Sequence, residues 1–326
     1  GHRKPYIIFG LLIQAACLLL VPLLNPSRQY WLFAGLAFLL MTGMALYDTA
    51  TDGLALDTTP LDEKGAIQGF MVGGRALGVV LISGVIGLLV ENTSWLMAFV
   101  LLAVLSLIPL PLVLQVHEAA RNKEHTFEWK AFHAFKAWPL IALGLVGVIY
   151  SLVINGANQI VNPYLTERFG INISTAGLVT TVWGFGVVAG SVAGGKLTDK
   201  WGQNQSVWRA MLLSFVSILF LAFTTQSWLI WPLVGLFGLA YGFYETVYFA
   251  VAMDRTDPRI AASMFSILMA VANIGTGIGL GLSGSLVDGV GFPLTFGILA
   301  GLNLLAIPLL PAIFGRRKRI TAVLEP

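Results

Sequence analysis

Ten long runs of apolar residues, separated by short polar segments, constrain the fold more than any other feature of this sequence. Crossing the hydrocarbon core of a bilayer takes about 20 mostly apolar residues in a helix. Only a helix satisfies its backbone hydrogen bonds within one such segment, so an isolated strand is excluded. The sequence therefore predicts an all-α integral membrane protein. Its ten helices are expected over residues 5–24, 31–56, 66–90, 95–114, 138–159, 176–197, 207–225, 228–253, 261–287 and 292–314.

The composition supports a membrane protein. Hydrophobic residues make up 57% of the chain and charged residues 11%, whereas soluble domains carry about 25% charged residues. The net charge of +3 does not indicate nucleic-acid binding, because the basic residues lie between the apolar runs. The single cysteine, Cys17, lies inside an apolar run, so no internal disulfide is expected.

The basic residues predict the orientation, because Lys and Arg are concentrated in cytoplasmic loops. If the first residue is cytoplasmic, sixteen of the 19 basic residues fall in cytoplasmic segments. Only Arg28 and Arg168 then fall outside, and Arg75 lies within a span. We therefore expect a multi-pass protein of the cell (inner) membrane, with both ends of this chain in the cytoplasm.

The longest polar segment, residues 115–137, follows four spans and precedes six. We expect residues 1–114 to form the remainder of an N-terminal bundle and residues 115–137 a cytoplasmic linker. Residues 138–315 are expected to form a C-terminal six-helix bundle, followed by a basic tail over residues 316–326. The linker carries Phe127, Trp129, Phe132 and Phe135, which favours a helix lying at the membrane surface.

The chain also repeats itself. A shift of 197 residues pairs Trp31 with Trp228, Tyr47 with Tyr244, Asp57 with Asp254, and Asp48 with Glu245. Two-bundle transporters are built by parallel duplication of this kind. In this register the first four spans match the last four, so we expect two pseudo-symmetric bundles. Two N-terminal spans are then expected to be absent from this chain, giving ten of twelve, and we expect the ten-span form alone not to transport.

A short motif lies between the sixth and seventh spans, with Gly195, Asp199, Lys200 and Gly202 as its main residues. It resembles the loop motif of the major facilitator superfamily. The start of the chain, with Gly1, Arg3 and Lys4, is similar to the end of the same motif in the first half. The resemblance implies the major facilitator fold and a gating role for these seven residues.

A narrower resemblance links the chain to the muropeptide permease and acetyl-coenzyme A transporter branch of that superfamily. It rests on the acidic residues from Asp48 to Asp57, and on Arg75 followed by Gly78. The chain lacks the tryptophan that this branch usually carries after the second aspartate, and has Leu54 nearby. The resemblance therefore implies a transporter without naming its solute.

Charged residues inside spans are costly in lipid, at least about 2.5–3.5 kcal/mol each on insertion scales. Arg75 lies near the middle of its span and is expected either in a structural ion pair or in substrate binding and gating. Asp48 and Asp52 are four residues apart on one helix face. The depths of Asp48 and Arg75, in consecutive antiparallel spans, predict that these two side chains pair.

Glu245 occupies the place of Asp48 in the second half, but the position that matches Arg75 is Ala272. A buried carboxylate without a basic partner would favour its protonated form. Glu245 is therefore a candidate to carry a coupling proton, and the alternative is a hydrogen-bonded structural acid.

Uncharged polar residues suggest further contacts. Asn155, Asn158 and Gln159 cluster in the fifth span, which lines the central cavity in the family that the chain resembles. They are candidates either for substrate contacts or for hydrogen bonds between helices. Asn273 and Trp183 are weaker candidates for the cavity.

The leading hypothesis is a secondary transporter that moves a small solute by alternating access and is coupled to protons. The alternative is a non-transporting membrane assembly factor of the same fold, similar to the light-harvesting complex assembly proteins. The sequence shows no zinc-ligand spacing, no nucleotide-binding glycine loop and no nucleophile with a base. We therefore expect no catalytic residue, metal or cofactor, and a monomer whose partners are the bilayer, a solute and H+.

Overall fold

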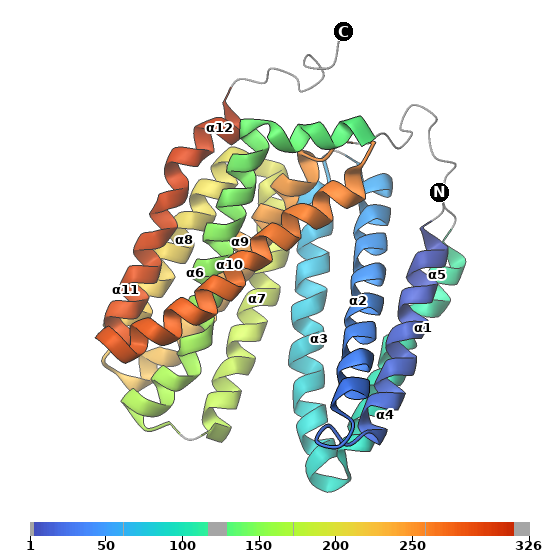
Figure 1. The fold of residues 1–326 in the computed structure, drawn as a ribbon. Coiled ribbons are helices and arrows are strands. Elements are labelled where there is room, and N and C mark those ends of the chain that lie inside the picture. Colours follow the sequence, from blue (N-terminus) through green and yellow to red (C-terminus); the bar gives the residue numbers. More distant parts are fainter. Residues whose placement is uncertain (1–2, 61, 117–128, 172, 258, 316–326) are drawn as a thin grey trace. The chain divides into compact units, whose positions relative to one another are not determined.

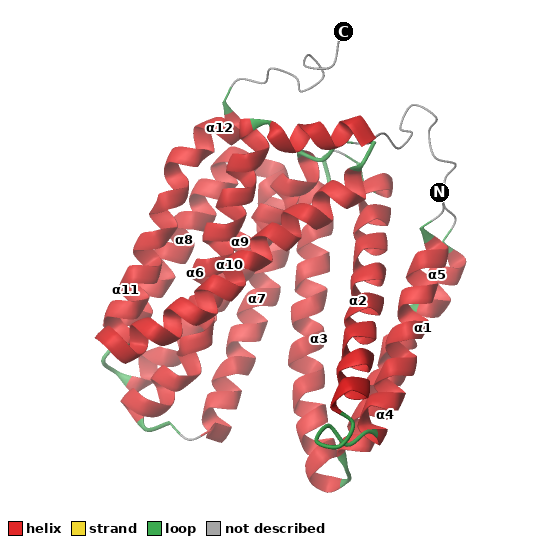
Figure 2. Ribbon diagram, in the orientation of Figure 1, coloured by secondary structure: helices red, strands yellow, loops and turns green. Residues whose placement is uncertain are grey.

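The computed structural model describes residues 3–60, 62–116, 129–171, 173–257 and 259–315. Figure 2 shows helices joined by short loops, with no strand in these ranges. Ten helical segments are long and apolar enough to cross a membrane, which confirms the predicted spans. The main helices are α1 (Lys4–Leu20), α2 (Tyr30–Thr58), α3 (Lys64–Asn92), α4 (Trp95–Leu107), α5 (Leu110–Gln115), α6 (Trp138–Phe169), α7 (Ile173–Trp201), α8 (Gln203–Phe223), α9 (Ile230–Asp254), α10 (Ala261–Val290), α11 (Phe292–Asn303) and α12 (Leu310–Phe314).

Four short 3₁₀ helices complete the described chain: η1 (Val21–Leu23), η3 (Trp129–Lys136), η4 (Ser227–Leu229) and η5 (Leu304–Leu309). Two of the predicted spans are interrupted at prolines, because proline removes a backbone donor inside a helix. The fourth span divides into α4 and α5 at Pro109. The tenth divides into α11, η5 and α12, with Pro308 inside η5 and Pro311 in the first turn of α12.

Local signals in the sequence set several helix ends. The Ser94 side chain accepts a hydrogen bond from the Met97 amide at 3.4 Å and caps α4. Gly170 ends α6 with a φ of +62°, a left-handed conformation that glycine adopts without strain. Proline stands in the first turn of α6 and of α11, where its missing N–H costs no helical hydrogen bond.

The described chain forms two compact units that do not follow the order of the sequence. Unit 1 contains Gly1–Thr58, Leu81–Phe127 and Ala261–Ser266, and unit 2 contains Thr59–Val80, Glu128–Ile260 and Ile267–Pro326. Two helices are therefore divided: α3 begins in unit 2, and α10 begins in unit 1. Lys64 and Ala261, the first residues of these helices, match each other in the 197-residue repeat.

In unit 1, α1 packs along α2 and against α4 and α5 (Figure 1). Its core contains Ile7, Leu11 and Ala50, with Tyr47 and Leu54 packed against them. A Cβ added at Gly10 would lie 2.8 Å from the Gly43 carbonyl oxygen. The two helices therefore meet through small residues, as membrane helices commonly do.

In unit 2, α9 packs against both α7 and α8, and α11 packs against α6 and α8. Figure 1 shows these helices in the green to red part of the chain. Tyr164, Phe237 and Phe296 are fully buried members of the core. Between α7 and α9, a side chain at Gly190 or Gly238 would collide with backbone atoms of the facing helix. This close contact fixes α7 against α9, and both helices carry residues of the candidate site.

Candidate functional site at the first half of helix α3

Asp199, from the motif at the end of α7, caps the beginning of α3. Its two carboxylate oxygens accept hydrogen bonds from the backbone amides of Gly65 at 2.8 Å and Ala66 at 2.7 Å. These amides have no partner within their own helix, and the N-terminus of a helix attracts negative charge. A residue that the motif marked for gating therefore binds a helix from the first half of the sequence.

The same two helices approach closely over the following turns. A Cβ added at Gly69 would lie 2.6 Å from the backbone oxygen of Ser191, and one at Gly65 would collide with the Gly195 carbonyl. A Cβ at Gly73 would lie in ordinary contact, 3.6 Å from the Cβ of Ser191. Glycines on both helices thus permit the contact that brings Asp199 to the α3 amides.

Lys64, the first residue of α3, extends the contact to the end of α9. Its ammonium nitrogen lies 3.6 Å from a carboxylate oxygen of Asp254 and 3.5 Å from the carbonyl oxygen of Met253. One turn later, Gln68 donates to the Met253 sulfur at 3.5 Å. The first turn of α3 is therefore held by α7 on one side and by α9 on the other.

Arg75 and Glu245 form an ion pair deeper in the membrane-spanning part. Arg75 Nη1 lies 3.5 Å from Glu245 Oε1, and the guanidinium also lies over the Phe249 ring, 5.7 Å from its centroid. The Glu245 side chain is 14% exposed and that of Arg75 is 59% exposed. The acid is thus largely enclosed, whereas the base is more than half exposed.

This pair corrects one sequence-based expectation. Glu245 was expected to lack a basic partner because the residue that matches Arg75 in the second repeat is Ala272. That expectation is wrong. The partner comes from α3, in the other repeat. The predicted Asp48–Arg75 pair joins residues of units 1 and 2 and stays a prediction.

Asn155 belongs to a polar cluster within unit 2. Its amide nitrogen donates to the Ser151 carbonyl at 2.9 Å and lies 3.2 Å from the Thr276 hydroxyl, while Tyr241 donates to its amide oxygen at 2.8 Å. The Trp183 ring meets that of Tyr241 edge to face, and the Trp183 indole N–H is buried with no described hydrogen-bond partner. The cluster joins α6, α9 and α10, as expected for helix–helix hydrogen bonds.

The remaining predicted residues have no hydrogen bond to this cluster among the contacts described. On α6, Asn158 is half-buried and Gln159 is exposed, and Asn273 is exposed on α10. Asp48 is exposed and Asp52 half-buried, one turn apart on α2. Their role as substrate or coupling residues stays a prediction.

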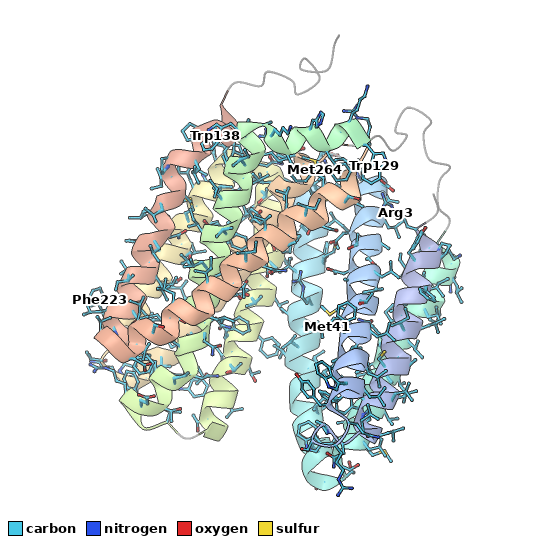
Figure 3. The ribbon with its side chains drawn as sticks, viewed as in Figure 1. Arg3, Met41, Trp129, Trp138, Phe223 and Met264 are labelled. Carbon is cyan, nitrogen blue, oxygen red and sulfur yellow. The ribbon has the colours of Figure 1, made fainter. Side chains whose placement is uncertain are left out.

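The basic residues at the start of the chain make contacts of their own within unit 1. Arg3 Nε donates to an Asp57 carboxylate oxygen at 2.6 Å, and Lys4 donates to the Leu114 carbonyl at the end of α5. Arg3 is labelled at the N-terminal end of α1 in Figure 3. Gly1 lies outside the described residues.

The second copy of the motif differs. Lys200 is exposed at the end of α7, and Gly202 has a φ of +82° in the turn to α8.

Sequence reasoning missed Lys64, Asp254 and Phe249 as members of the site. The repeat pairs Asp57 with Asp254, and this match could have indicated Asp254. Nothing in the sequence indicated Phe249. Among the described residues, no group of three or more His, Cys, Asp or Glu could hold a metal ion.

Comparison with known proteins yields matches over both halves of the chain. The family model of the Major Facilitator Superfamily matches residues 1–156 and again residues 143–325. The anhydromuropeptide permease of Escherichia coli is 23% identical over 303 residues, which is 84% of this chain and 58% of that protein. The chain thus spans less than two thirds of this relative. An uncharacterized MFS-type transporter of Bacillus subtilis is 26% identical over 136 residues, which cover 40% of this chain and 33% of that protein.

Two solved structures share the fold. The human organic anion transporter TETRAN superposes with a TM-score of 0.75 at 16% identity, covering 95% of this chain and 77% of that one. The transporter FucP, in its outward conformation, superposes with a TM-score of 0.73 at 16% identity, covering 96% and 84%. At these identities the likeness concerns the arrangement of the helices.

Proposed function

Because this chain belongs to the major facilitator superfamily, we propose that it is part of a secondary active transporter that moves a small solute by alternating access. Movement of the solute is coupled to movement of protons in the same direction, so the protein works as a symporter in the cell membrane. The observation that carries the proposal is the ion pair between Arg75 and Glu245, on two different membrane-spanning helices. A charge held inside a span is costly, so such residues mark ion and substrate pathways.

The pair has the chemistry that proton coupling requires. Arginine remains charged, whereas a carboxylate can accept a proton. Protonation of Glu245 removes its attraction for Arg75 and frees the guanidinium to bind another group. Loss of the proton restores the pair. One proton can thus shift the balance between two arrangements of α3 and α9, to the extent that its affinity differs between them.

The contacts at the beginning of α3 support alternating access. Asp199, Lys64 and Asp254 hold this part of α3 against α7 and α9. Opening of the protein at this end requires that these contacts release. Because the loop charges predict that α3 begins on the cytoplasmic side, the contacts would close the cytoplasmic route.

For the solute, the relationship to the anhydromuropeptide permease gives the first compounds to test. We propose a polar solute of that kind. Arg75, whose side chain is 59% exposed, suits an anionic group on the solute, since a guanidinium binds carboxylates through two parallel hydrogen bonds.

The proposal is tested with the complete natural protein in proteoliposomes. An imposed pH gradient should drive uptake of the solute. Glu245→Gln should abolish gradient-driven uptake while leaving solute exchange across the membrane at no less than half the original rate. Loss of both activities in a folded protein would contradict the coupling role. Absence of uptake for every polar solute tested would favour the assembly-factor alternative.

A further inference from the structure

The linker contains an unusually long 3₁₀ helix. In η3 the eight residues Trp129–Lys136 form one continuous 3₁₀ segment, although such runs seldom exceed three or four residues. A 3₁₀ helix has three residues per turn, so side chains three apart lie directly above one another. In an α-helix, side chains three apart share a face but are offset by about 60° around the axis at each step. The segment therefore presents three straight columns.

The first column is aromatic. Trp129 stacks on Phe132 with ring centroids 5.8 Å apart, and Phe132 stacks on Phe135 at 6.2 Å. Three residues of a 3₁₀ helix rise about 6 Å, which matches both separations. Stacking of these rings thus accounts for the persistence of the 3₁₀ form. Trp129, at one end of the column, is 78% exposed.

The second column consists of basic residues and the third of small ones. Lys130, His133 and Lys136 lie one above the other and are all exposed. Within the described chain, none of the three has an ion-pair or hydrogen-bond partner. Ala131 is 1% exposed and Ala134 is half-buried, so the alanine column is the one turned away from solvent. An aromatic and a basic face thus lie beside each other on the outer side.

The segment also adjoins the end of a membrane-spanning helix. It ends at Lys136, two residues before α6 begins at Trp138. Trp138 is 56% exposed at the end of this span, a place where tryptophan marks the boundary between lipid and water. Figure 1 shows the green segment running across the end of α6, and Figure 3 labels Trp129 and Trp138.

We propose that η3 is a binding site for anionic phospholipids. The basic column of Lys130, His133 and Lys136 contacts the negatively charged headgroups, and the aromatic column lies in the interfacial layer. Amphipathic segments with basic and aromatic faces bind anionic membranes in this way. The loop charges predict that η3 faces the cytoplasm, where the leaflet carries negative lipids. This site is independent of the transport site in α3 and α9.

The test measures lipid preference in the complete natural protein. The purified protein is mixed with equal amounts of phosphatidylglycerol and phosphatidylcholine, and bound lipids are counted by native mass spectrometry. The original protein should bind phosphatidylglycerol preferentially, and increasing salt should weaken the preference. Lys130→Gln/Lys136→Gln should reduce the preference, by roughly fivefold for each lysine that lies at the headgroups.

A matched control removes the same charge elsewhere. Arg28→Gln/Arg168→Gln changes two exposed arginines that the loop charges predict on the opposite side of the membrane and should retain the preference. Inorganic phosphate at millimolar concentration should not displace the lipid, because the aromatic column contributes to lipid binding alone. Equal reduction in both double variants, or an unchanged preference in Lys130→Gln/Lys136→Gln, would overturn the proposal. Displacement by phosphate would show a simple anion site and would overturn it as well.

A second measurement remains informative if the lysine variant folds poorly. In liposomes of brominated phosphatidylglycerol, bromine quenches tryptophans that lie at the membrane. Trp129→Phe should remove a strongly quenched component of the fluorescence, because Trp129 would be immersed in the interface. Identical quenching in the original protein and Trp129→Phe would contradict lipid contact at η3.

Discussion

Asp57 and Asp254 occupy the same position in the two repeats but have different partners. Asp57 pairs with Arg3 at 2.6 Å, a contact inside the first repeat and inside unit 1. Asp254 lies 3.6 Å from Lys64, the first residue of α3, which belongs to the other repeat. The two repeats thus carry the same acid at this position and pair it with different basic residues.

The difference recurs along α3. Three acids of the second repeat contact the first half of this helix: Asp199 at its first amides, Asp254 at Lys64, and Glu245 at Arg75. All of these residues belong to unit 2. By sequence α3 belongs to the first repeat, but by its polar contacts its first half belongs with the second. The repeat to which a helix belongs therefore does not determine which helices hold it.

The largest effect is expected at Arg75. Arg75→Ala leaves the largely enclosed Glu245 carboxylate without its partner. The loss of stability should be below the roughly 3–5 kcal/mol of a fully buried pair, because the Arg75 side chain is 59% exposed. Reversible unfolding in SDS measures it. Arg75→Ala/Glu245→Ala should recover most of the loss, and a double variant as unstable as the sum of the single ones would show that the two residues act separately.

A smaller effect is expected at Asp199, which caps α3 through two amides. Asp199→Ala should cost about 1 kcal/mol of stability, the usual cost of removing a helix cap. Asp57→Ala is the comparison, because its carboxylate is 51% exposed and exposed pairs contribute about 0–1 kcal/mol. The same unfolding assay measures the loss of stability in both variants. A larger loss for Asp57→Ala would reverse the contrast between the repeats.

The smallest effect is expected at Lys64, whose contact with Asp254 is long and partly exposed. Lys64→Gln should cost less than about 1 kcal/mol, and 1 M salt should largely remove the difference. Arg3→Gln should behave similarly in the first repeat. If Lys64→Gln proved as damaging as Arg75→Ala at both salt concentrations, the first turn of α3 would be held more by Lys64 than by the Asp199 cap.

The fold was predictable because its signals are local or regular. Apolar runs of the required length located all ten spans, and the family motif around Asp199 led to the family that the comparison confirms. The partner of Glu245 was not predictable in the same way. In the repeat, Ala272 is the residue of the second half that matches Arg75. The actual partner, Arg75, belongs to a helix in the other half. No periodicity in one sequence encodes a contact between helices so far apart along the chain.

Asn155 was a plausible candidate from the sequence, but its contacts could not be foreseen. An amide inside a span must bond to something, and the sequence indicates that need without naming the partner. Tyr241, on α9, supplies the donor to its oxygen. The partner was missed because tyrosines are frequent in α9 and nothing in their spacing distinguishes this one.

We propose that the first half of α3, which is held against α7, must separate from it during transport. Gly73→Cys/Ser191→Cys tests it directly in the complete natural protein, in a Cys17→Ala background. A Cβ at Gly73 lies 3.6 Å from the Ser191 Cβ, within the usual 3.5–4.5 Å of a disulfide. Gly78→Cys/Ser191→Cys is the control, because no described atom beyond the backbone of α3 itself lies within 4 Å of a Cβ at Gly78.

We predict that mild oxidation cross-links the first pair but not the control, that uptake by the cross-linked protein stops, and that a reductant restores it. Failure of the Gly73→Cys/Ser191→Cys thiols to cross-link would contradict the contact between α3 and α7. Uptake by the cross-linked protein at the rate of the reduced protein would contradict the requirement that this contact opens.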